Sequence, residues 1–278
     1  MSSFGLSIGD VVAQTGVAEP TLRMWERRYG FPEPRRTESG HRRYSHEQVD
    51  VVQRVLVLRE AGLSLPAAIA RAQTPPDPAA LSLFSTLRDL RPELEPRPVG
   101  KPVLIALSHA IEDEALARAD ARIMFGCFQR ERFYRSSRAR WRELSAAAHV
   151  AAVFADFEQV SEPEVGPAEV PIGRRQNISR EWAIVLYGGR SSVCMIGREL
   201  ASSNVDASSR DRSFELLWTV DPEAVRVVAR VCAVVMRDRL PELAASTDES
   251  LAIDSTAVPT ELVRLTTAIV NRTLSELS

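Results

Sequence analysis

Arginine is the residue type whose spacing in this sequence suggests a chemical function, because arginines gather in one short segment. Between Arg23 and Arg43 there are seven arginines and three glutamates, a net charge of +4. The whole chain of 278 residues has a formal net charge of −2 and a pI of about 6.2. A local cationic segment predicts an anion-binding surface, and the acidic balance of the chain argues against a protein that coats nucleic acid without specificity.

Two short helices are expected at the start of this region. The first spans Ile8–Thr15, with Ser7 as its N-cap and a glycine at residue 16 after its end. The second runs from about Glu19 to Tyr29, with a proline in its first turn and a glycine at residue 30. Three residues, 16–18, join the two helices, which is the length of a helix-turn-helix connection.

The second helix has two chemically different faces. At about 100° per residue, Leu22, Trp25 and Tyr29 fall in one narrow sector that is expected to pack inward. Arg23 and Arg27, four residues apart, fall on the opposite side. The major groove of DNA accommodates a helix, and arginine is the commonest reader of guanine there. The alternative is an ordinary solvated helix face, and the helix alone does not decide between the two interpretations.

The segment PRRTESGHRRY, residues 34–44, favours the DNA-binding interpretation. Gly40 supplies the positive φ for a turn over residues 38–40, and the flanks Pro34–Thr37 and His41–Tyr44 are predicted to pair as a short hairpin. A hairpin beside a helix-turn-helix is a wing. Four arginines of this wing would reach backbone phosphates or the minor groove: Arg35, Arg36, Arg42 and Arg43.

The sequence LSIGDVVAQTGVAEPTLRMWERRYGFPEPRRTESGHRRYS, residues 6–45, resembles the winged helix-turn-helix of the MerR family of bacterial transcriptional regulators. Its second half, from LRMWERRYGF onward, is most similar to the subgroup that includes light-responsive, cobalamin-binding repressors. The resemblance extends over Leu6–Ala72, about a quarter of the chain. It implies a sequence-specific regulator that binds double-stranded promoter DNA between promoter elements.

The resemblance also implies roles for individual residues. Ala18 stands where the family usually has a serine N-cap, which weakens the start of the second helix by about 1 kcal/mol. The family pattern places Thr21, Arg23 and Arg27 on the recognition helix, and His41, Arg42 and Tyr44 in the wing. With the neighbouring arginines added, the candidate DNA-binding residues are Thr21, Arg23, Arg27, Arg28, Arg35, Arg36, His41, Arg42, Arg43 and Tyr44.

Proline density marks the end of this domain. Seven of the 17 prolines fall between Pro75 and Pro102, and proline-rich segments behave as stiff spacers. The predicted organisation is a DNA-binding domain over 1–73 and a linker over 74–101 with a short helix at Ala79–Leu90. A sensory domain over 102–241 follows, and then an acidic loop and an amphipathic helix over 242–278. Serine-rich residues 201–212 are also expected to form a loop.

The second half of the chain mixes strand and helix patterns. Five apolar runs, RIMFGCF, VAAVFADF, WAIVLYG, SVCMIG and SFELLWT, are typical of buried strands. Helical patterns are VLIALSHAIEDEALAR, in which the acidic IEDEAL is interpreted as a solvated face, RERFYRSSRARWRELSAAAH and DPEAVRVVARVCAVVMRDRL. The predicted fold class is α+β: an all-helical winged helix-turn-helix followed by a mixed α/β sensory domain with a sheet of about five strands.

Short motifs in this half resemble the DICT domain, a bacterial sensory module found with diguanylate cyclases, phosphodiesterases and two-component proteins. The motifs are LSHAIEDEAL, FGCFQRERFYR, EWAIVLYG and SFELLWTVDPEAV, and the resemblance covers about Val103–Leu240. It implies a sensory role associated with light responses and assigns no ligand. The chain is therefore expected to change its promoter binding in response to a small molecule, a chromophore or a protein partner. The alternative is a signalling scaffold in which DNA binding serves only to localise the chain.

A sensor pocket is expected where the first strand meets the following basic helix, because open α/β sheets place ligands at such junctions. Its candidate residues are Cys127, Gln129, Arg132, Tyr134, Trp182 and Trp218. The alternative is that the tryptophans fill the core, that Cys127 is a buried structural thiol, and that the arginines form a solvated or partner-facing helix.

No cofactor or metal site is predicted. The DxHxxG-type loop of cobalamin-binding relatives and the cysteine loop of metal-sensing relatives are absent from the sequence, and His109 and His149 stand alone. Three widely spaced cysteines without a CxxC pair fit a reducing cytoplasm, and no signal peptide or membrane span is found. Catalytic motifs such as GxSxG, a P-loop or HExxH are also missing, so the chain is predicted not to be an enzyme.

A homodimer is expected, because DNA readers with a two-fold partner bind paired half-sites. The amphipathic helix Thr260–Leu277 has Val263, Val270, Leu274 and Leu277 in near-heptad spacing. Its apolar stripe is widened by Leu262, Leu265 and Ile269, and it fits docking on its own domain at least as well as a dimer seam.

Overall fold

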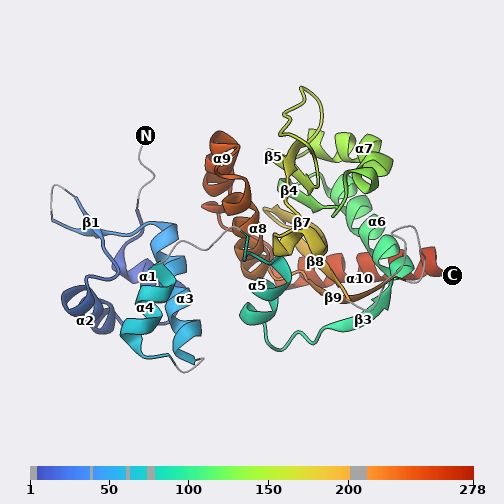
Figure 1. Ribbon diagram of the computed structural model, residues 1–278. Helices are drawn as coiled ribbons and strands as arrows, with labels where there is room; N and C mark the ends of the chain where they lie inside the picture. Colours follow the sequence, from blue (N-terminus) through green and yellow to red (C-terminus); the bar gives the residue numbers. More distant parts are fainter. Residues whose placement is uncertain (1–4, 38–39, 61–62, 74–78, 201–211) are drawn as a thin grey trace. The chain divides into compact units, whose positions relative to one another are not determined.

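The computed structural model describes residues 5–37, 40–60, 63–73, 79–200 and 212–278. The chain divides into two compact units, Met1–Pro76 and Asp77–Ser278 (Figure 1). Each unit has its own hydrophobic core. Among the described residues, no helix is both long enough and apolar enough to cross a membrane.

The first unit is helical apart from one hairpin, as predicted. Ser7 caps the first helix with its Oγ 3.2 Å from the amide nitrogen of Asp10, and Gly16 and Gly30 end the first two helices with φ of 71° and 65°. The elements are α1 (Ile8–Thr15), α2 (Glu19–Tyr29), β1 (Arg35–Arg36), β2 (Arg42–Arg43), α3 (His46–Glu60) and α4 (Leu65–Gln73).

The core of the first unit joins all four helices to the base of the hairpin. Trp25 of α2 stacks on Phe31, with their ring centroids 6.2 Å apart. The other buried members include Val11, Leu22, Tyr44, Val49, Val52, Val55, Ala68, Ile69 and Ala72. This packing fixes α2 by its apolar face and leaves its opposite face outside the core.

The second unit is a mixed sheet with helices on both faces. Its helices are α5 (Leu83–Leu90), α6 (Lys101–Arg118), α7 (Glu131–Ala146), α8 (Pro222–Met236), α9 (Pro241–Leu251) and α10 (Pro259–Leu277), with a short 3-10 helix at Asn177–Arg180. Its strands are β3 (Arg97–Gly100), β4 (Ala121–Cys127), β5 (Val150–Ala155), β6 (Ala168–Pro171), β7 (Glu181–Gly188), β8 (Ser192–Glu199) and β9 (Ser213–Thr219).

The strand order is β3-β9-β8-β7-β4-β5-β6. The pairs from β3 to β4 are antiparallel, and β4-β5 and β5-β6 are parallel. Successive side chains of a strand point to opposite faces, so Phe125 and Cys127 lie in one core and Met124 lies in the other. Burial on both faces explains why these strands read as continuous apolar runs.

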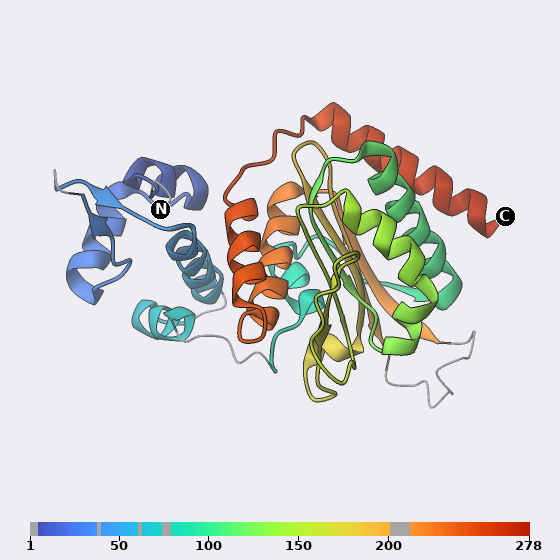
Figure 2. The same ribbon diagram turned by 90° about the horizontal axis from the view of Figure 1, so that it is seen from above.

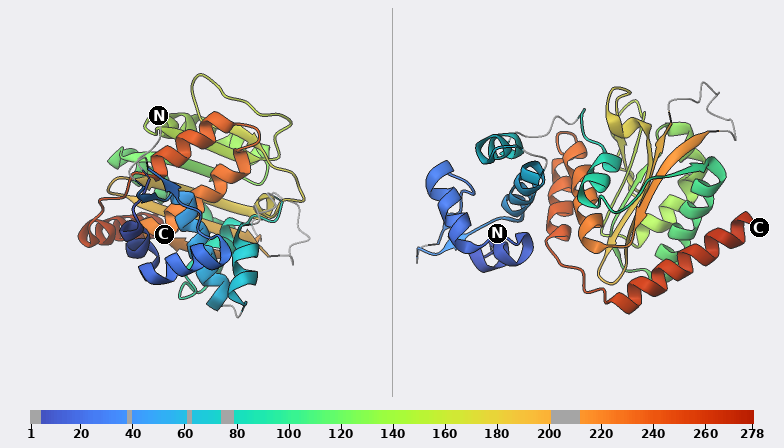
Figure 3. Two further views of the ribbon diagram at one scale, coloured as in Figure 1. Left: turned by 90° about the vertical axis from the view of Figure 1, so that its left-hand side faces the viewer. Right: turned by 90° about the horizontal axis from the view of Figure 1, so that it is seen from below.

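Three helices cover each face of the sheet. Figures 2 and 3 show α5, α8 and α9 on one side and α6, α7 and α10 on the other. The packing is tight where α7 crosses β4, because a Cβ atom added at Gly126 would collide with the indole ring of Trp141. All five predicted strands and the three predicted helices α6, α7 and α8 are confirmed.

The sheet has seven strands rather than about five. The two additional strands, β3 and β6, are four residues long and contain Pro98 and Pro171. They form the two edges of the sheet, where a missing backbone N–H costs no interior ladder bond. Because they are short and contain proline, these two strands lack the apolar run that predicts a strand from the sequence.

The prediction of a linker over 74–101 is wrong for its second part, while residues 74–78 lie outside the described residues. Leu83, Phe84 and Leu87 of α5 are completely buried in the core of the second unit. β3 pairs with β9, so residues 97–100 also belong to the sheet. Proline density was a poor guide here because the prolines flank α5 instead of interrupting it.

The acidic loop predicted from residue 242 is also wrong, because residues 241–251 form α9. Pro241 occupies the first turn, where proline is tolerated, and Ala244 and Leu251 pack into the core. Serine, threonine and aspartate lowered the expected helix propensity, and the packing of Ala244 and Leu251 into the core outweighs that preference. The loop predicted over 201–212 lies outside the described residues, apart from Arg212.

Candidate nucleic-acid interface

Helix α2 presents a cationic face to solvent. Leu22 and Trp25 are 1% and 6% exposed and hold the helix on the core. Arg23, Arg27 and Arg28 are exposed. The helical period separates the two faces: Arg23 and Arg27, four residues apart, share one face, and Leu22 and Trp25 lie on the other. The predicted two-faced character of this helix is confirmed.

The start of α2 has the missing cap that the sequence predicts. Ala18 stands at the N-cap position and makes no side-chain cap hydrogen bond. The amide of Thr21, a half-buried residue, donates to the carbonyl oxygen of Ala18 at 2.9 Å. Glu19 lies in the first turn, where a carboxylate interacts favourably with the helix dipole, and it pairs with Arg23 at 2.5 Å.

The wing is a two-residue ladder in which every strand residue is an arginine. Arg35 pairs with Arg43 and Arg36 pairs with Arg42. At the turn, Gly40 has a φ of 82°, as predicted, and its amide donates to the carbonyl oxygen of Thr37 at 2.8 Å. Residues 38 and 39 of the predicted turn lie outside the described residues. The neighbouring His41 is exposed.

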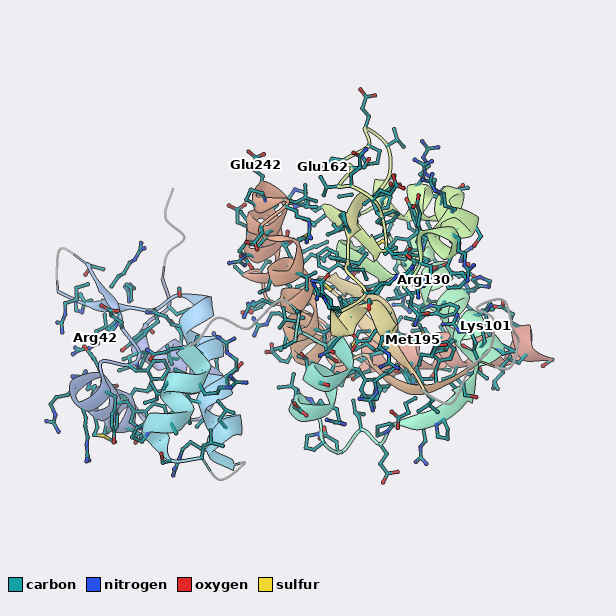
Figure 4. The ribbon with its side chains drawn as sticks, in the orientation of Figure 1. Arg42, Lys101, Arg130, Glu162, Met195 and Glu242 are labelled. Atoms are coloured by element: carbon teal, nitrogen blue, oxygen red, sulfur yellow. The ribbon has the colours of Figure 1, made fainter. Side chains whose placement is uncertain are left out.

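Glu26 of α2 ties the wing to the helix. Its carboxylate accepts hydrogen bonds from Nε of Arg42 at 2.8 Å and from Nη2 of the same residue at 3.3 Å. Arg36 also approaches, with Nη2 3.7 Å from Oε1. The hydrogen bond to Glu26 raises the pKa of Arg42 above its ordinary value. The pairing fixes the angle between α2 and the hairpin; Figure 4 labels Arg42 on the wing.

Tyr44 does not present its ring to a ligand. It is 2% exposed and lies in the core of the first unit, and burial raises the pKa of its hydroxyl. Its backbone exchanges two hydrogen bonds with Leu6, of 2.7 and 2.8 Å, which anchor the end of the wing. The structure therefore places Tyr44 beneath the candidate surface, as a support and not as a contact.

Four arginines of the candidate set have no carboxylate within ion-pair distance among the described residues. They are Arg27 and Arg28 on α2 and Arg35 and Arg43 on the wing. Arg27, Arg28 and Arg35 are exposed, and Arg43 is half-buried. Sequence spacing found these cations, but it missed Glu26, since nothing in a separation of sixteen residues reveals its contact with Arg42.

The six candidate residues of a sensor pocket do not share one site. Cys127 lies in the core under α5 and α8, and Tyr134 lies in the core on the opposite face of the sheet. Burial raises the pKa of the Cys127 thiol well above its ordinary value, and the Cys232 thiol beside it adds to the effect. Cys127 is therefore a buried structural thiol. It is the last residue of β4, and its side chain points into the core under α5 and α8.

The remaining sensor candidates lie on the same face of the sheet as Tyr134: Trp182 and Trp218 pack against its core, and Arg212, the partner of Gln129, lies over Phe214 of that core. Gln129 is buried, accepts a hydrogen bond from Arg212 at 2.7 Å, and donates to the carbonyl oxygen of Arg180 at 3.0 Å. Arg132 is exposed, Trp182 packs edge-on against Phe214, and Trp218 lines a surface hollow with residues 93–97. Gln129 and Arg212 form a buried polar contact with each other. The two residues are far apart in the sequence, so their spacing does not reveal this contact.

The acidic stretch of α6 is not the solvated face that its composition suggests. Glu112 and Glu114 are 4% and 7% exposed. Glu112 accepts hydrogen bonds from Nε1 of Trp141, at 3.1 Å, and from Arg140. Burial raises the pKa of Glu112, and the charge of Arg140 opposes that effect. Arg140 of α7 covers Glu112, and Arg118 of α6 and Arg272 of α10 cover Glu114, which explains why these carboxylates are buried.

Comparison with known proteins separates the two units. Residues 6–73 match the family described as MerR HTH family regulatory protein. Residues 81–200 match the family described as sensory domain in diguanylate cyclases and two-component system.

Curated relatives match part of this chain and are regulatory proteins. They include the HTH-type transcriptional repressor CarA of Myxococcus xanthus, 49% identical over 73 residues, which is 26% of this chain and 25% of that protein. The mercuric resistance operon regulatory protein of Bacillus cereus is 40% identical over 58 residues, 21% of this chain and 44% of that protein. The HTH-type transcriptional regulator MlrA of Escherichia coli K12 is 37% identical over 49 residues, 18% and 20% respectively.

The shared part thus spans less than half the length of each of these relatives. The second unit has a different relationship, to sensory modules. The chain therefore combines a MerR-family helix-turn-helix domain in its first unit with a DICT sensory domain in its second.

Proposed function

We propose that this chain is a transcriptional regulator that binds promoter DNA with α2 and the wing, and that its second unit senses a signal and changes that binding. In the proposed complex, α2 lies in the major groove. The wing contacts the backbone or the minor groove beside it. The observation that carries the proposal is a set of four arginines on these two elements that have no carboxylate within ion-pair distance in the described part of the chain: Arg27, Arg28, Arg35 and Arg43.

Electrostatics supports an anionic ligand for this surface. Elsewhere on the same helix and hairpin, Arg23, Arg36 and Arg42 have glutamate partners, so charge pairing within the protein was available. The unpaired arginines gain a partner when phosphates or guanine edges approach. Because the chain as a whole carries a formal charge of −2, its net charge gives no general attraction for DNA, and binding depends on a local cationic surface such as this one.

The experiment begins with a duplex selected from a random pool by the full-length chain, and it measures affinity by fluorescence anisotropy. Arg27→Ala and Arg28→Ala should each weaken binding by about 1–3 kcal/mol, because each removes a cation of α2 that has no carboxylate partner among the described residues. Arg174→Ala, which removes an exposed arginine of the second unit, is the matched control and should leave affinity unchanged. Equal affinities for the two α2 variants and the wild type would refute the assignment of α2 to the groove.

The sensory part of the proposal concerns the second unit. Its DICT relationship supports a signal input, and the signal is proposed to be a small molecule, a chromophore or a protein partner. Native mass spectrometry and absorption spectroscopy of the chain purified from its own host would reveal a bound chromophore or metabolite. Recovery of a ligand whose addition changes DNA affinity supports the proposal, and a ligand-free chain would shift it toward a protein partner.

The alternative of a signalling scaffold relied on the basic helix α7 as a partner surface. Most arginines of α7 and its N-cap are engaged within the unit: Arg130 with Asp156, Arg135 with Glu131, Arg138 with Glu169, and Arg140 with Glu112 and Asp113. Little of the charge on this helix remains for an acidic partner. The regulator is therefore the function that the arrangement of charges supports best.

A further inference from the structure

Arg212, the residue before β9, is a buried cation whose guanidinium is only partly engaged. Its side chain is 4% exposed. Nε and Nη2 donate to the carboxylate of Glu199 at 2.7 and 2.9 Å, and Nη2 also donates to Oε1 of Gln129 at 2.7 Å. Nη1 is buried and has no hydrogen-bond partner in the described part of the chain. Because a buried charged donor without an acceptor is costly, this nitrogen is suited to a ligand that brings an acceptor oxygen.

Three cations lie close to the ring of Phe133, in the first turn of α7. Cζ of Arg132 and Cζ of Arg212 lie 5.1 and 5.5 Å from the ring centroid, and Nζ of Lys101 lies 5.8 Å from it. Arg132 is exposed and Lys101 is half-buried, so both side chains border solvent. Within the described ranges, neither of these two has a carboxylate at ion-pair distance. Glu199 balances the charge of Arg212, and the other two positive charges remain.

Two long helices begin beside these cations. α6 starts at Lys101 and α7 at Glu131, and they are 18 and 16 residues long. The amide of Lys101 donates to the carbonyl oxygen of Arg212 at 3.1 Å, which joins the start of α6 to the residue with the buried guanidinium. Figure 4 labels Lys101 and Arg130 at the starts of the two helices. Neither Gly100 nor Arg130, the N-cap residues, makes a side-chain cap hydrogen bond. Since a helix N-terminus carries a partial positive charge, both helices add to the attraction for an anion.

One carboxylate near the start of α7 is already engaged. Asp156 accepts from the backbone amide of Glu131 at 2.7 Å and from Nη1 of Arg130 at 3.1 Å. It therefore satisfies the first amide of α7 and the cation before it, and the charges of Lys101 and Arg132 stay unbalanced.

The cations gather where a parallel strand of the sheet ends. β4 ends at Cys127, two residues before Gln129, and the chain continues into α7. Open α/β sheets bind ligands at the carboxyl ends of such strands. Gln129 has a φ of 62°, which is uncommon for a residue other than glycine and is found at ligand-binding sites. The place is that of the predicted sensor pocket, with Lys101, Phe133 and Arg212 as members that the sequence did not reveal.

We propose that these residues bind the phosphate group of a small molecule, and that this molecule is the signal that the second unit senses. The Arg212 site consists of Lys101, Gln129, Arg132, Phe133, Glu199 and Arg212. The inference rests on the proposed function only for the role of the ligand as a signal, because the binding site itself follows from the charges and donors of the second unit.

Phosphate fits the charges and the donors of the Arg212 site. A phosphate monoester carries about −1.5 to −2 charges at pH 7, which balances Lys101 and Arg132. Its oxygens accept from Nη1 of Arg212 in a charge-assisted hydrogen bond. A single carboxylate would leave one of the two charges unbalanced. Lys101, on a flexible stem, and the exposed Arg132 reach the anion from the solvent side.

Isothermal titration calorimetry of the full-length chain tests the site with inorganic phosphate, phenyl phosphate and succinate. Phosphate should bind saturably, and the first two probes distinguish a free phosphate from a phosphate ester as the ligand. Lys101→Gln/Arg132→Gln should weaken this binding by about 10-fold or more, because two charge-assisted contacts are lost. Arg190→Gln/Arg239→Gln removes two exposed arginines of the same unit outside the site. It is the matched control and should bind phosphate like the wild type.

The double variant also separates this site from the cationic surface of the first unit. Phosphate bound by α2 and the wing would persist in Lys101→Gln/Arg132→Gln, so equal binding by this variant and the wild type would overturn the Arg212 site. Absence of saturable phosphate binding by the wild type would overturn it too. Equal affinity for succinate, which has two carboxylates, would overturn the assignment of phosphate.

Anisotropy with the selected duplex tests whether the ligand is the signal. At constant ionic strength, phosphate should change the DNA affinity of the wild type and leave that of Lys101→Gln/Arg132→Gln unchanged. Phosphate binding without a change in DNA affinity supports the site and refutes its role in sensing. A chain that binds phosphate but no duplex refutes only the regulator, and a chain that binds a duplex but no phosphate refutes only the Arg212 site.

Discussion

The two units differ in how their arginines are paired. In the second unit thirteen arginines of the described residues have a carboxylate within 4 Å, and in several of these pairs one partner is buried. On α2 and the wing three arginines have such a partner, and four have none among the described residues. Arginine–carboxylate pairs thus join elements within the second unit, whereas more than half of the arginines on α2 and the wing are left for an outside anion.

One residue of the first unit behaves like those of the second. Arg42 was expected to contact DNA, and the structure pairs it with Glu26 of α2. Its side chain is 24% exposed, and its guanidinium makes a forked contact with the carboxylate. A pair of this geometry positions the wing, so the cationic surface contains both binding arginines and a positioning arginine.

The largest expected effect concerns a paired arginine of the second unit. Glu112→Ala removes the carboxylate that accepts from Arg140 and Trp141. The variant leaves a buried indole N–H without an acceptor and a cation without its nearest partner. We expect the free energy of unfolding to fall by about 3–5 kcal/mol, measured by denaturant titration.

Asp113→Ala is the control for this variant. Asp113 pairs with the same Arg140, but its side chain is 41% exposed, so the expected loss is below about 1 kcal/mol. If the two variants were equally stable, the buried ion pair of Glu112 would not stabilise the second unit, and its arginines would not differ in role from those of the first unit.

The next effect concerns pH, through Glu181 at the start of β7. Its carboxylate is 1% exposed, accepts from Ser82 and from the backbone amide of Leu83, and caps α5. Burial raises its pKa from the ordinary 4.5 to about 7. A carboxyl group with a raised pKa stabilises the fold while it is protonated, so its contribution is complete below pH 4.5 and is lost as the pH rises through about 7.

The difference between 4.5 and about 7 corresponds to about 3 kcal/mol at most. Glu181→Gln should therefore flatten the fall in unfolding free energy between about pH 4.5 and pH 7, measured by denaturant titration across that range. Lys101→Gln, at a half-buried position in the same unit, is the control and should keep the wild-type slope. Identical slopes for wild type and Glu181→Gln would show that this carboxyl group does not titrate in the folded unit.

A smaller effect tests whether Arg42 is a positioning residue. Glu26→Gln removes a negative charge from the DNA-facing surface, so simple electrostatics predicts tighter binding. The geometry predicts weaker binding, by about 1 kcal/mol, because the forked contact that holds the wing against α2 is lost. Anisotropy with the selected duplex measures it, and Glu33→Gln, outside this contact, is the matched control. Tighter binding by Glu26→Gln would place Arg42 among the DNA contacts after all.

The sequence predicts the elements of both units well and their long-range contacts poorly. The ends of α1 and α2 follow from Ser7, Gly16 and Gly30, because caps are local signals. The five central strands follow from apolar runs. The edge strands and α9 were missed, since proline and serine signals at the surface are outweighed by pairing and burial that only the fold creates.

The same distinction applies to the candidate sites. Arginines on one helix face are found from their period, so the cationic surface was predicted. The contact of Glu26 with Arg42 and the burial of Glu112 depend on how separate elements pack together. The spacing of these residues in the sequence therefore does not predict them. The predicted sensor pocket is wrong in Cys127 for a related reason: strand alternation sends Cys127 into the core under α5 and α8, whereas Tyr134 of α7 lies in the core on the opposite face.

The salt dependence of DNA binding tests the central claim most directly. The logarithm of the association constant falls with the logarithm of salt concentration, by about 0.9 for each phosphate contact. We expect a clearly shallower slope of the association constant against salt for a variant in which four arginines are replaced by alanine together: Arg27, Arg28, Arg35 and Arg43. Arg42→Ala should weaken binding while its slope stays close to that of the wild type. A quadruple variant with the wild-type slope would contradict the account.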